Sequence, residues 1–455
     1  MSAVADMPLA MQMAASDARA RKNRIYTIGF FAVVVIYFFA SFVQFELFRV
    51  VERWNPDRAA LFVLDTYAHK DHITMRWKEP EEIRVAFEGG HRHVYDPLPA
   101  WFTYTDDGGQ VVDFDNGGTM TIYKDRVVMA SWPKTTRDYV FLRNEGGSPY
   151  VEDYKDNPQD LPDFIRVTEN KIEVRPTLFE RLQVYKSKVE IHRYEVGWKY
   201  FWFDFDSPLV GTGFFGAIGL IFSGDRVVPD QSNFSLVLDQ FLENDIWHHG
   251  IVLFALLETI LMALIGTMIA SMLGLPLGFL AARNVTPFSS VRFALRRLFD
   301  FLRGIDTLIW SLIFLRAFGP GLFTGMFAIA FTDTGTLGKL MSEAIENADG
   351  KQVEGIQSTG AKRVQRYRFG IVPQIMPVFI SQSLYYLESN TRSAVIIGAM
   401  GAGGIGLQFL GALQTGTDFE NVAYMAILVL LTVIAMDAMS ARLRRALIGM
   451  DEDKH

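Results

Sequence analysis

The chain has 455 residues, of which 50% are hydrophobic and 13% aromatic, and its formal net charge is -7 at pH 7. This length is sufficient for a membrane bundle and one further domain. The absence of cysteine excludes disulfides and thiolate metal sites, and the acidic balance argues against a nucleic-acid partner.

The N-terminal part predicts a membrane helix. Residues 1–24 are interpreted as a cytoplasmic tail, and residues 25–45 are uncharged over about the length of a bilayer crossing, with no small-x-small cleavage site after them. The basic cluster before this run places the N-terminus in the cytoplasm and sends the next segment to the opposite side. This cluster consists of Arg19, Arg21, Lys22 and Arg24.

Residues 46–206 predict a mainly-β insert. The stretch is rich in charged and aromatic residues and contains no apolar run that could span a membrane. Residues 119–123 alternate in character, and the Asp, Asn and Gly clusters at 106–109 and 115–118 are typical of turns between strands. Because the preceding helix leads out of the cytoplasm, the insert is expected in the periplasm.

Two histidines in the insert are candidate metal ligands. His91 and His93 are two positions apart and would share one face of a strand, which permits metal binding. Isolated histidine pairs without a carboxylate constellation are usually surface residues, so no metal site is predicted.

Two interpretations of an aromatic cluster at the end of the insert stay open. The rings either lie at the headgroup level, where the chain returns to the membrane, or form the core of the insert itself. The cluster consists of Trp198, Tyr200, Phe201, Trp202 and Phe203.

The stretch 207–250 follows the insert and contains an apolar run at 208–222. This run is short for a crossing and holds four glycines. A crossing here would reverse the orientation of the next helix, so we interpret the stretch as interfacial or re-entrant.

Residues 251–447 predict a membrane bundle whose crossings alternate in direction. The run 251–282 ends at basic residues, so its C-terminal end is expected in the cytoplasm. Together with the N-terminal helix, the later runs give about six crossings with both chain ends cytoplasmic. The later runs are 305–318, 322–332, 373–387 and 422–436, with a glycine-rich connection at 401–406. The basic residues that follow the run 251–282 are Arg283, Arg292, Arg296, Arg297 and Arg303. Three further arginines, Arg442, Arg444 and Arg445, precede the cytoplasmic tail 448–455.

A polar and basic stretch at 351–373 separates two strongly apolar regions. A short helix carrying Glu354 is expected to break at Gly360, because glycine tolerates the backbone of a tight helix exit. Pro373 is then expected to open the next helix in its first turn. The charge pattern places this element on the cytoplasmic side.

The spacing of Glu354, Gly360 and Pro373 resembles the EAA loop of ABC importer permeases, the cytoplasmic segment that docks on the ATPase subunit. Gly355 and Ile356 replace two of the usual alanines, and Gly370 occupies a position near the end of the loop where a hydrophobic residue is usual. Four further blocks are similar to the phosphonate-type permeases, and the resemblance covers about 236–447. The blocks are RGIDTLIWSLIFLRAFGPG at 303–321, LGKLMSEAIE at 337–346, VPQIMP at 372–377 and SAVIIGAMGAGGIG at 393–406.

The resemblance implies a type I ABC importer permease fold, an α-helical integral membrane bundle of a bacterial inner membrane. It also implies several partners: a dimer of ABC ATPase subunits, a periplasmic substrate-binding protein, a second permease copy and membrane lipid. The chain has no GxxxxGK[ST] motif, so it is predicted to be a transporter subunit without enzymatic activity or cofactor, with ATP and Mg on the partner ATPase. The residues implied in ATPase coupling are Glu354, Gly355, Gly360, Ala361 and Pro373.

Ionisable residues within the predicted crossings are candidates for the translocation pathway, because charge inside a membrane is costly. Glu388 and Arg392 are four residues apart and form either a structural ion pair or, with the polar residues of 389–393, a station for an anion. Asp306 and Thr307 either line the exit or cap a helix. The candidates are Glu258, Asp306, Arg316, Glu388, Arg392 and Ser393.

Four glycines after the fifth crossing also have two interpretations. They either act as a gate hinge or allow close backbone packing, and both agree with the freedom and small size of glycine. They are Gly401, Gly403, Gly404 and Gly406.

The sequence therefore predicts an ABC importer permease subunit for phosphonate or a related phosphorus oxyanion. Two alternatives stay open. One is a permease for another small solute, such as phosphate or an amino acid, because the coupling motif does not specify cargo. The other is a membrane sensor whose β insert binds a ligand and whose bundle transmits the signal.

Overall fold

The structure is a computed structural model that describes residues 9–46, 49, 54–88, 93–133, 135, 137–155, 157, 160–415 and 419–448. The chain divides into two compact units, 1–62 and 63–455. The first unit is dominated by helix α1, Leu9–Gln44, within which Ala20–Gln44 is long and apolar enough to cross a membrane. The helix predicted for 25–45 is therefore present. Helix α3, Pro56–Asp65, leads into the second unit.

The insert is a β-sandwich of two antiparallel six-stranded sheets, which confirms its predicted mainly-β character. The first sheet has the order β2-β1-β12-β11-β10-β9 and the second runs from β3 to β8 in sequence order. The strands are β1 Ala68–Arg76, β2 Glu79–Phe87, β3 Phe102–Tyr104, β4 Gln110–Asp113, β5 Thr119–Ile122, β6 Val127–Ala130, β7 Tyr139–Arg143, β8 Pro149–Val151, β9 Ile165–Val167, β10 Lys171–Val174, β11 Glu180–Tyr185 and β12 Lys188–Val196.

The inner faces of the two sheets form one hydrophobic core. Alternate residues of each strand point to the same face, so Ile73 and Ile191 of the first sheet meet Met120 and Phe141 of the second, all without exposed surface. The predicted turns after 105 and 114 are present, and a glycine with positive φ lies in each. The placement of the sandwich in the periplasm remains a prediction.

Two short helices connect the sandwich to the bundle. Helix α4, Phe214–Ser223, and helix α5, Asn233–Leu242, have ten residues each, about half the length that a crossing needs. They pack on each other through Ala217 and Leu236, together with Phe203 from the end of the insert. This agrees with the prediction that 208–222 does not cross, while its interfacial position remains a prediction.

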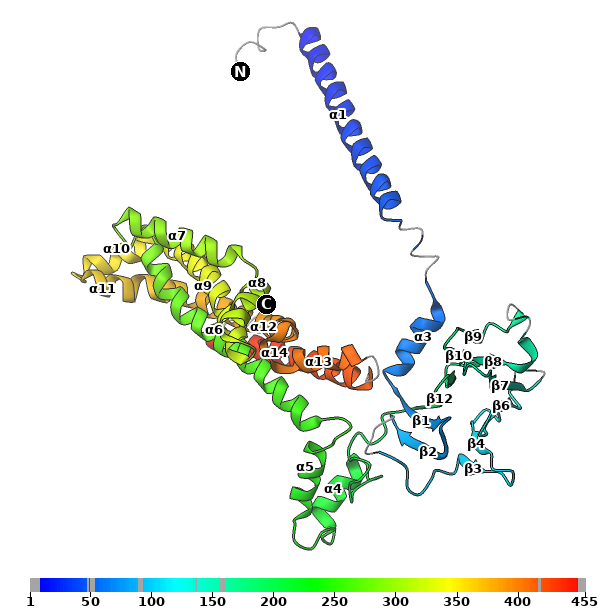
Figure 1. Cartoon of the computed structure of the whole chain (residues 1–455). Coiled ribbons are helices and arrows are strands. Elements are labelled where there is room, and N and C mark those ends of the chain that lie inside the picture. Colours follow the sequence, from blue (N-terminus) through cyan, green and yellow to red (C-terminus); the bar gives the residue numbers. More distant parts are fainter. Residues whose placement is uncertain are drawn as a thin grey trace. The chain divides into compact units, whose positions relative to one another are not determined.

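The bundle is built on the contact between α6 and α9, which lie side by side (Figure 1). Glycines allow the close approach: a Cβ on Gly274 or Gly278 of α6 would press on Leu337 or Met341 of α9. Small residues at helix contacts let two backbones approach in a lipid environment. The elements are α6 His249–Ala281, α7 Ser289–Gly304, α8 Thr307–Phe318, α9 Leu322–Glu346, α10 Gly350–Ser358, α11 Arg363–Arg366, the π-turn η3 Tyr367–Ile371, α12 Val372–Ile397, the π-turn η4 Gly398–Ala402, α13 Gly404–Thr415 and α14 Phe419–Ile448.

The basic stretch after α6 is a helix rather than only a charged connection. Helix α7 packs Phe299 and Leu302 against α9, at the points where α9 carries Gly338 and Gly335. Arg296 also contacts α9, through Glu346, whereas the apolar Phe293 and Phe301 of α7 are exposed. From the sequence alone, the arginines of α7 indicate only the cytoplasmic side of the bundle.

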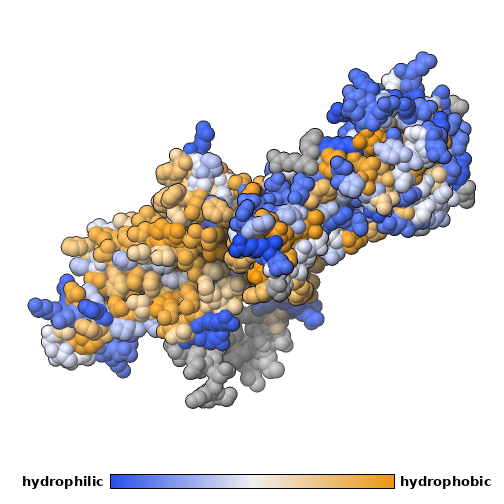
Figure 2. Space-filling model, turned by 90° about the horizontal axis from the view of Figure 1, so that it is seen from below, coloured by the Kyte–Doolittle hydropathy of each residue, from blue (hydrophilic) through white to orange (hydrophobic). Residues whose placement is uncertain are grey.

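Among the described residues, three helices are long and apolar enough to cross a membrane: Ala20–Gln44, His249–Ala281 and Phe419–Leu447. The pair Arg363–Ala402 and Gly404–Thr415, bent by 62°, adds a fourth if it forms one span. Figure 2 shows hydrophobic residues gathered over the helices and hydrophilic residues over the sandwich. The bundle surface is therefore suited to lipid, while the predicted number of six crossings is not decided.

An aromatic cluster joins the end of the sandwich to the bundle. Trp198 and Phe201 pack with Trp247 and Tyr424, and His249 contacts both Phe201 O and Tyr424 Oη, at 2.6 and 2.8 Å. Neither Trp198 nor Phe201 belongs to the core of the sandwich. The bundle supplies the packing partners of Trp198 and Phe201, while Tyr200 packs on Phe87 at the end of β2, so the cluster is not simply the insert's own core.

A pair of acidic side chains also lies at this junction. Glu88 follows β2 and lines the same cavity as Glu420, in the first turn of α14. Burial and the neighbouring Glu420 raise the pKa of Glu88 well above its usual value, and nearby Lys70 opposes this rise.

We expect Glu88→Gln to change the pH dependence of stability. A raised pKa means that the folded chain keeps a proton that the unfolded chain loses, so stability falls as pH rises above the ordinary Glu range, by up to about 1.4 kcal/mol for each unit of the shift. The buried His72 and His192, whose pKa values are lowered by burial, act in the opposite direction in both proteins, because stability gained from a neutral buried histidine rises with pH. The unfolding temperature of Glu88→Gln should therefore rise relative to that of the wild type between pH 6 and pH 8. Thermal unfolding of the detergent-solubilised chain, followed by tryptophan fluorescence, measures it.

The matched control is Glu81→Gln, which changes an exposed glutamate of the same strand. It should keep the wild-type pH dependence. An unchanged pH dependence in Glu88→Gln would show that the acidic pair does not hold a proton.

Candidate functional site

Helix α10 presents the predicted coupling residues on the surface. Its N-terminus is capped by Asp349, whose Oδ1 accepts the backbone N–H of Lys351 at 2.9 Å. Glu354 and Gly355 are exposed. The opposite face of α10 is half-buried, and Val353 packs there in a cluster of residues from α9, η3 and α12. One face of the helix is thus held by the bundle, and the other is free to contact a partner.

The predicted break at Gly360 is confirmed. Helix α10 ends at Ser358, and Gly360 has φ +81°, the left-handed conformation in which a side chain is strained. Ala361 follows and is half-buried. Across this turn, Arg366 Nη1 of α11 donates to Gln357 Oε1 of α10 at 2.7 Å, which holds the two short helices together.

The predicted position of Pro373 is confirmed, because α12 begins at Val372 and Pro373 lies in its first turn. The helical run itself starts earlier than predicted, at Arg363, and continues through the π-turn η3 into α12. The backbone N–H of Val372 bonds to the carbonyl of Tyr367, five residues earlier. The π-turn is wider than an α-turn and joins α11 to α12 without a break. Pro373, which has no N–H to donate, follows it in the first turn of α12.

Glu258 and the glycine-rich break meet at one point of the bundle. Glu258 Oε2 accepts the backbone N–H of Gly404 at 3.1 Å, and Thr259 Oγ1 accepts that of Ile405 at 2.9 Å. These N–H groups open α13 and have no partner within their own helix. Two side chains of α6 thus cap α13, so Glu258 has a structural role that sequence analysis did not foresee.

The glycines around this break serve two purposes. Gly401, Gly403 and Gly404 have φ values of +108°, +86° and +70°, so the backbone itself requires glycine there. Gly406 has ordinary φ, but a Cβ would overlap the carbonyl oxygen of Val395. Backbone conformation accounts for three of them and close packing for the fourth, while a gating role remains a prediction.

Glu388 is shared by two arginines. Its oxygens lie 3.5 Å from Arg392 Nη2 and 3.7 Å from Arg444 Nη1. The expected contact between Glu388 and Arg392 is therefore present. Arg444 comes from α14, where sequence analysis treated it only as an anchor at the membrane edge.

The predicted polar station at 389–393 is not formed by these residues together. Arg392 is exposed, whereas Asn390 and Thr391 are buried on another side of α12, because successive residues of a helix point in different directions. Asn390 Nδ2 donates to Thr267 Oγ1 at 2.8 Å and to Asp333 Oδ2 at 2.5 Å. Ser393 is half-buried.

Asp333 is the residue that sequence analysis missed. It is 6% exposed and belongs to α9. Its carboxylate accepts from Asn390 of α12, which also donates to Thr267 of α6. Its signal was a single acid in the run FAIAFTDTGTLG at 327–338. A buried acid within a membrane bundle is a candidate functional group by the same rule that selected Glu258.

The remaining pathway candidates lie at the ends of α8. Asp306 Oδ1 accepts the backbone N–H of Leu308 at 2.8 Å, so Asp306 is the helix cap that was one of its two interpretations. Arg316 is exposed in the last turn of the same helix. These two residues stand at opposite ends of a 12-residue helix and do not form one site.

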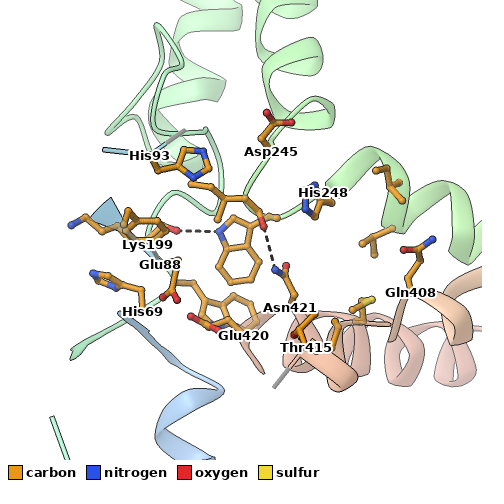
Figure 3. Close-up of a pocket in the computed structure, with 18 of the residues that line it drawn as sticks. His69, Glu88, His93, Lys199, Asp245, His248, Gln408, Thr415, Glu420 and Asn421 are labelled. Atoms are coloured by element: carbon orange, nitrogen blue, oxygen red, sulfur yellow. Dashed lines mark hydrogen bonds between the residues drawn. The ribbon is translucent and has the colours of Figure 1, made fainter. Parts of the chain in front are cut away.

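A cavity of about 480 Å³ lies where the end of the sandwich meets α6, α13 and α14 (Figure 3). Trp247 lines it, and its Nε1 donates to the carbonyl of Lys199 at 3.0 Å. His93 lines the cavity, and its Nε2 lies 3.6 Å from Asp204 Oδ1. His91, its proposed partner as a metal ligand, lies outside the described residues. The other labelled side chains are His69, Glu88, Asp245, His248, Gln408, Thr415, Glu420 and Asn421.

The comparisons with known proteins concern the bundle. The model of the family "Binding-protein-dependent transport system inner membrane component" matches residues 274–448. A putative cryptic phosphonate transport system permease protein of Escherichia coli K12 is 43% identical over 123 residues, which are 27% of this chain and 100% of that protein. A phosphite transport system permease protein of Stutzerimonas stutzeri is 35% identical over 190 residues, 42% of this chain and 69% of that protein.

A phosphate-import permease protein of Mycolicibacterium smegmatis is 35% identical over 191 residues, 42% of this chain. The match spans only 36% of that longer protein. The Escherichia coli and Stutzerimonas relatives are each covered over more than two thirds of their length. The chain therefore belongs to the family of binding-protein-dependent transport system inner membrane components.

Proposed function

We propose that the chain is the permease subunit of an ABC importer for phosphonate or a related phosphorus oxyanion. The observation that carries the proposal is the similarity of the bundle to permeases named for phosphonate, phosphite and phosphate. The exposed face of α10 supports it, because Glu354 and Gly355 are available to a partner while Val353 is held by the bundle.

In this proposal a separate pair of ATPase subunits binds ATP and Mg, and a groove on each one grips α10. Movement of α10 passes to α12 through Val353, Ile371 and Ile375, which pack in one cluster. Helix α12 carries Asn390, which is bonded to α6 and α9, so tilting of α12 would alter the centre of the bundle. Nucleotide would thus bias two states of the bundle, one open to each side.

The assembly in this proposal has twofold symmetry. A second copy of the chain completes the pathway, and a periplasmic binding protein delivers the anion to the outer side. Both chain ends and α10 would be cytoplasmic in a bacterial inner membrane, and the sandwich periplasmic. Arg392 and Arg444, which both contact Glu388, are cationic groups suited to an oxyanion.

We expect Glu354→Arg to abolish coupling without unfolding the chain. Glu354 is exposed on α10, so its replacement changes the surface offered to the ATPase and leaves the core intact. Co-purification of the ATPase subunit and transport-coupled ATP hydrolysis in liposomes should both fall by at least about tenfold, a loss of roughly 1.4 kcal/mol or more.

The matched control is Glu343→Arg, which reverses the charge of another exposed glutamate, on α9. It should leave both measurements near wild type. Normal ATPase recovery and coupling in Glu354→Arg would remove α10 from the docking surface and would favour the alternative of a membrane sensor.

The cargo can be tested separately. Proteoliposomes holding the chain, its ATPase and a matching binding protein should show ATP hydrolysis stimulated by an alkylphosphonate or phosphite, since the relatives are named for such anions. Methionine serves as the control solute of another class. Stimulation by methionine alone would contradict the phosphorus-oxyanion assignment while leaving the permease assignment intact.

A further inference from the structure

Four polar residues stand in register on two neighbouring strands of the sandwich. In the antiparallel pairing of β1 with β12, His69 is opposite Glu195 and Asp71 is opposite Arg193. All four side chains are on the face whose next pair, Ile73 and Ile191, is in the hydrophobic core. The inner face of the sheet therefore changes from apolar to polar at this end.

His69 is arranged as a neutral ligand. It is 4% exposed, and its Nδ1 lies 3.3 Å from the carbonyl oxygen of Gly197, so Nδ1 carries the hydrogen and Nε2 keeps a lone pair. Nε2 is buried without a hydrogen-bond partner among the described residues. Burial lowers the pKa of His69, which favours the neutral ring. A histidine that binds a metal through one ring nitrogen usually donates the N–H of its other ring nitrogen to a carbonyl or carboxylate oxygen.

Two carboxylate oxygens face this nitrogen. Asp71 is fully buried; its Oδ1 accepts the hydroxyl hydrogen of Tyr95 at 2.6 Å, while its Oδ2 has no hydrogen-bond partner among the described residues. Glu195 Oε2 lies 3.4 Å from His69 Nε2. One ligand atom from each of the three residues lies within 4.8 Å of the others. Three acceptors thus converge with no hydrogen-bond donor between His69 and Glu195.

Two cations border the cluster. Arg193 Nη2 donates to both oxygens of Asp115, at 2.9 and 3.0 Å, and Arg193 Nη1 donates to Glu195 Oε2 at 3.3 Å and lies 4.0 Å from Asp71 Oδ2. Lys199 Nζ lies 3.4 Å from Tyr95 Oη. Three carboxylates, those of Asp71, Glu195 and Asp115, thus face two cations, so negative charge remains to attract a divalent ion.

We propose that His69, Asp71 and Glu195 form a binding site for a divalent transition-metal ion of the Zn²⁺ type. One imidazole and two carboxylates are a ligand set that such ions accept. Ligands at about 2.0–2.2 Å from the metal are roughly 3–3.5 Å apart, close to the separation of His69 and Glu195. The ion would join β1 to β12 beside Gly197, where the chain leaves the sandwich for the aromatic cluster, and would stiffen this junction.

The test is a metal titration of the full-length chain in detergent, after removal of metal with a chelator. Zn²⁺ should bind with a stoichiometry of one ion per chain, measured by calorimetry and by elemental analysis after gel filtration. Co²⁺ should give visible absorption bands in the same site. Glu195→Gln, whose side chain is about half exposed, should weaken binding by at least about tenfold.

The control is Glu190→Gln on the same strand, whose side chain is on the opposite face of the sheet and contacts Lys188. It should bind Zn²⁺ as the wild type does. Asp71→Asn keeps the size of the buried side chain and should also lose binding. Absence of a stoichiometric ion in the wild type, or equal affinity in wild type and Glu195→Gln at unchanged circular dichroism, would overturn the proposal.

Discussion

The close contact of α6 with α9 is the constraint on which the bundle depends. It exists because glycines of α6 leave room for Leu337 and Met341, so that the two backbones approach. This approach places Thr267 of α6 beside Asp333 of α9, and both bond to Asn390 of α12. A polar group buried in a bundle is stable only when it is paired, and the three-helix arrangement supplies the pairs.

The same helix also controls the irregular parts of the structure. Its N-terminal end holds His249, which contacts the chain leaving the sandwich and the start of α14. About two and a half turns further on, Glu258 and Thr259 cap the opening of α13. Broken helices are tolerated in membrane proteins when neighbouring groups satisfy the free backbone. Helix α6 therefore connects the sandwich, the glycine-rich break and the centre of the bundle.

The sequence predicted the elements whose signals are local. Length and charge indicated the helix ending at Gln44, alternation and turn residues indicated the strands, and Gly360 marked the end of α10. Pro373 marked the first turn of α12, but no local signal indicated the short helix and π-turn that lead into it from Arg363. The blocks at 303–321 and 393–406 pointed to the family that the comparisons then showed.

By itself, then, the sequence determined that a membrane bundle of this family follows a β domain, because periodicity and motif spacing are properties of the chain alone. Only the tertiary structure decided what each polar residue contacts. Asp333 and Asn390 are 57 residues apart, and His69 and Glu195 meet through strand pairing. Contacts between distant residues depend on how helices and strands pack, and no local pattern records that packing.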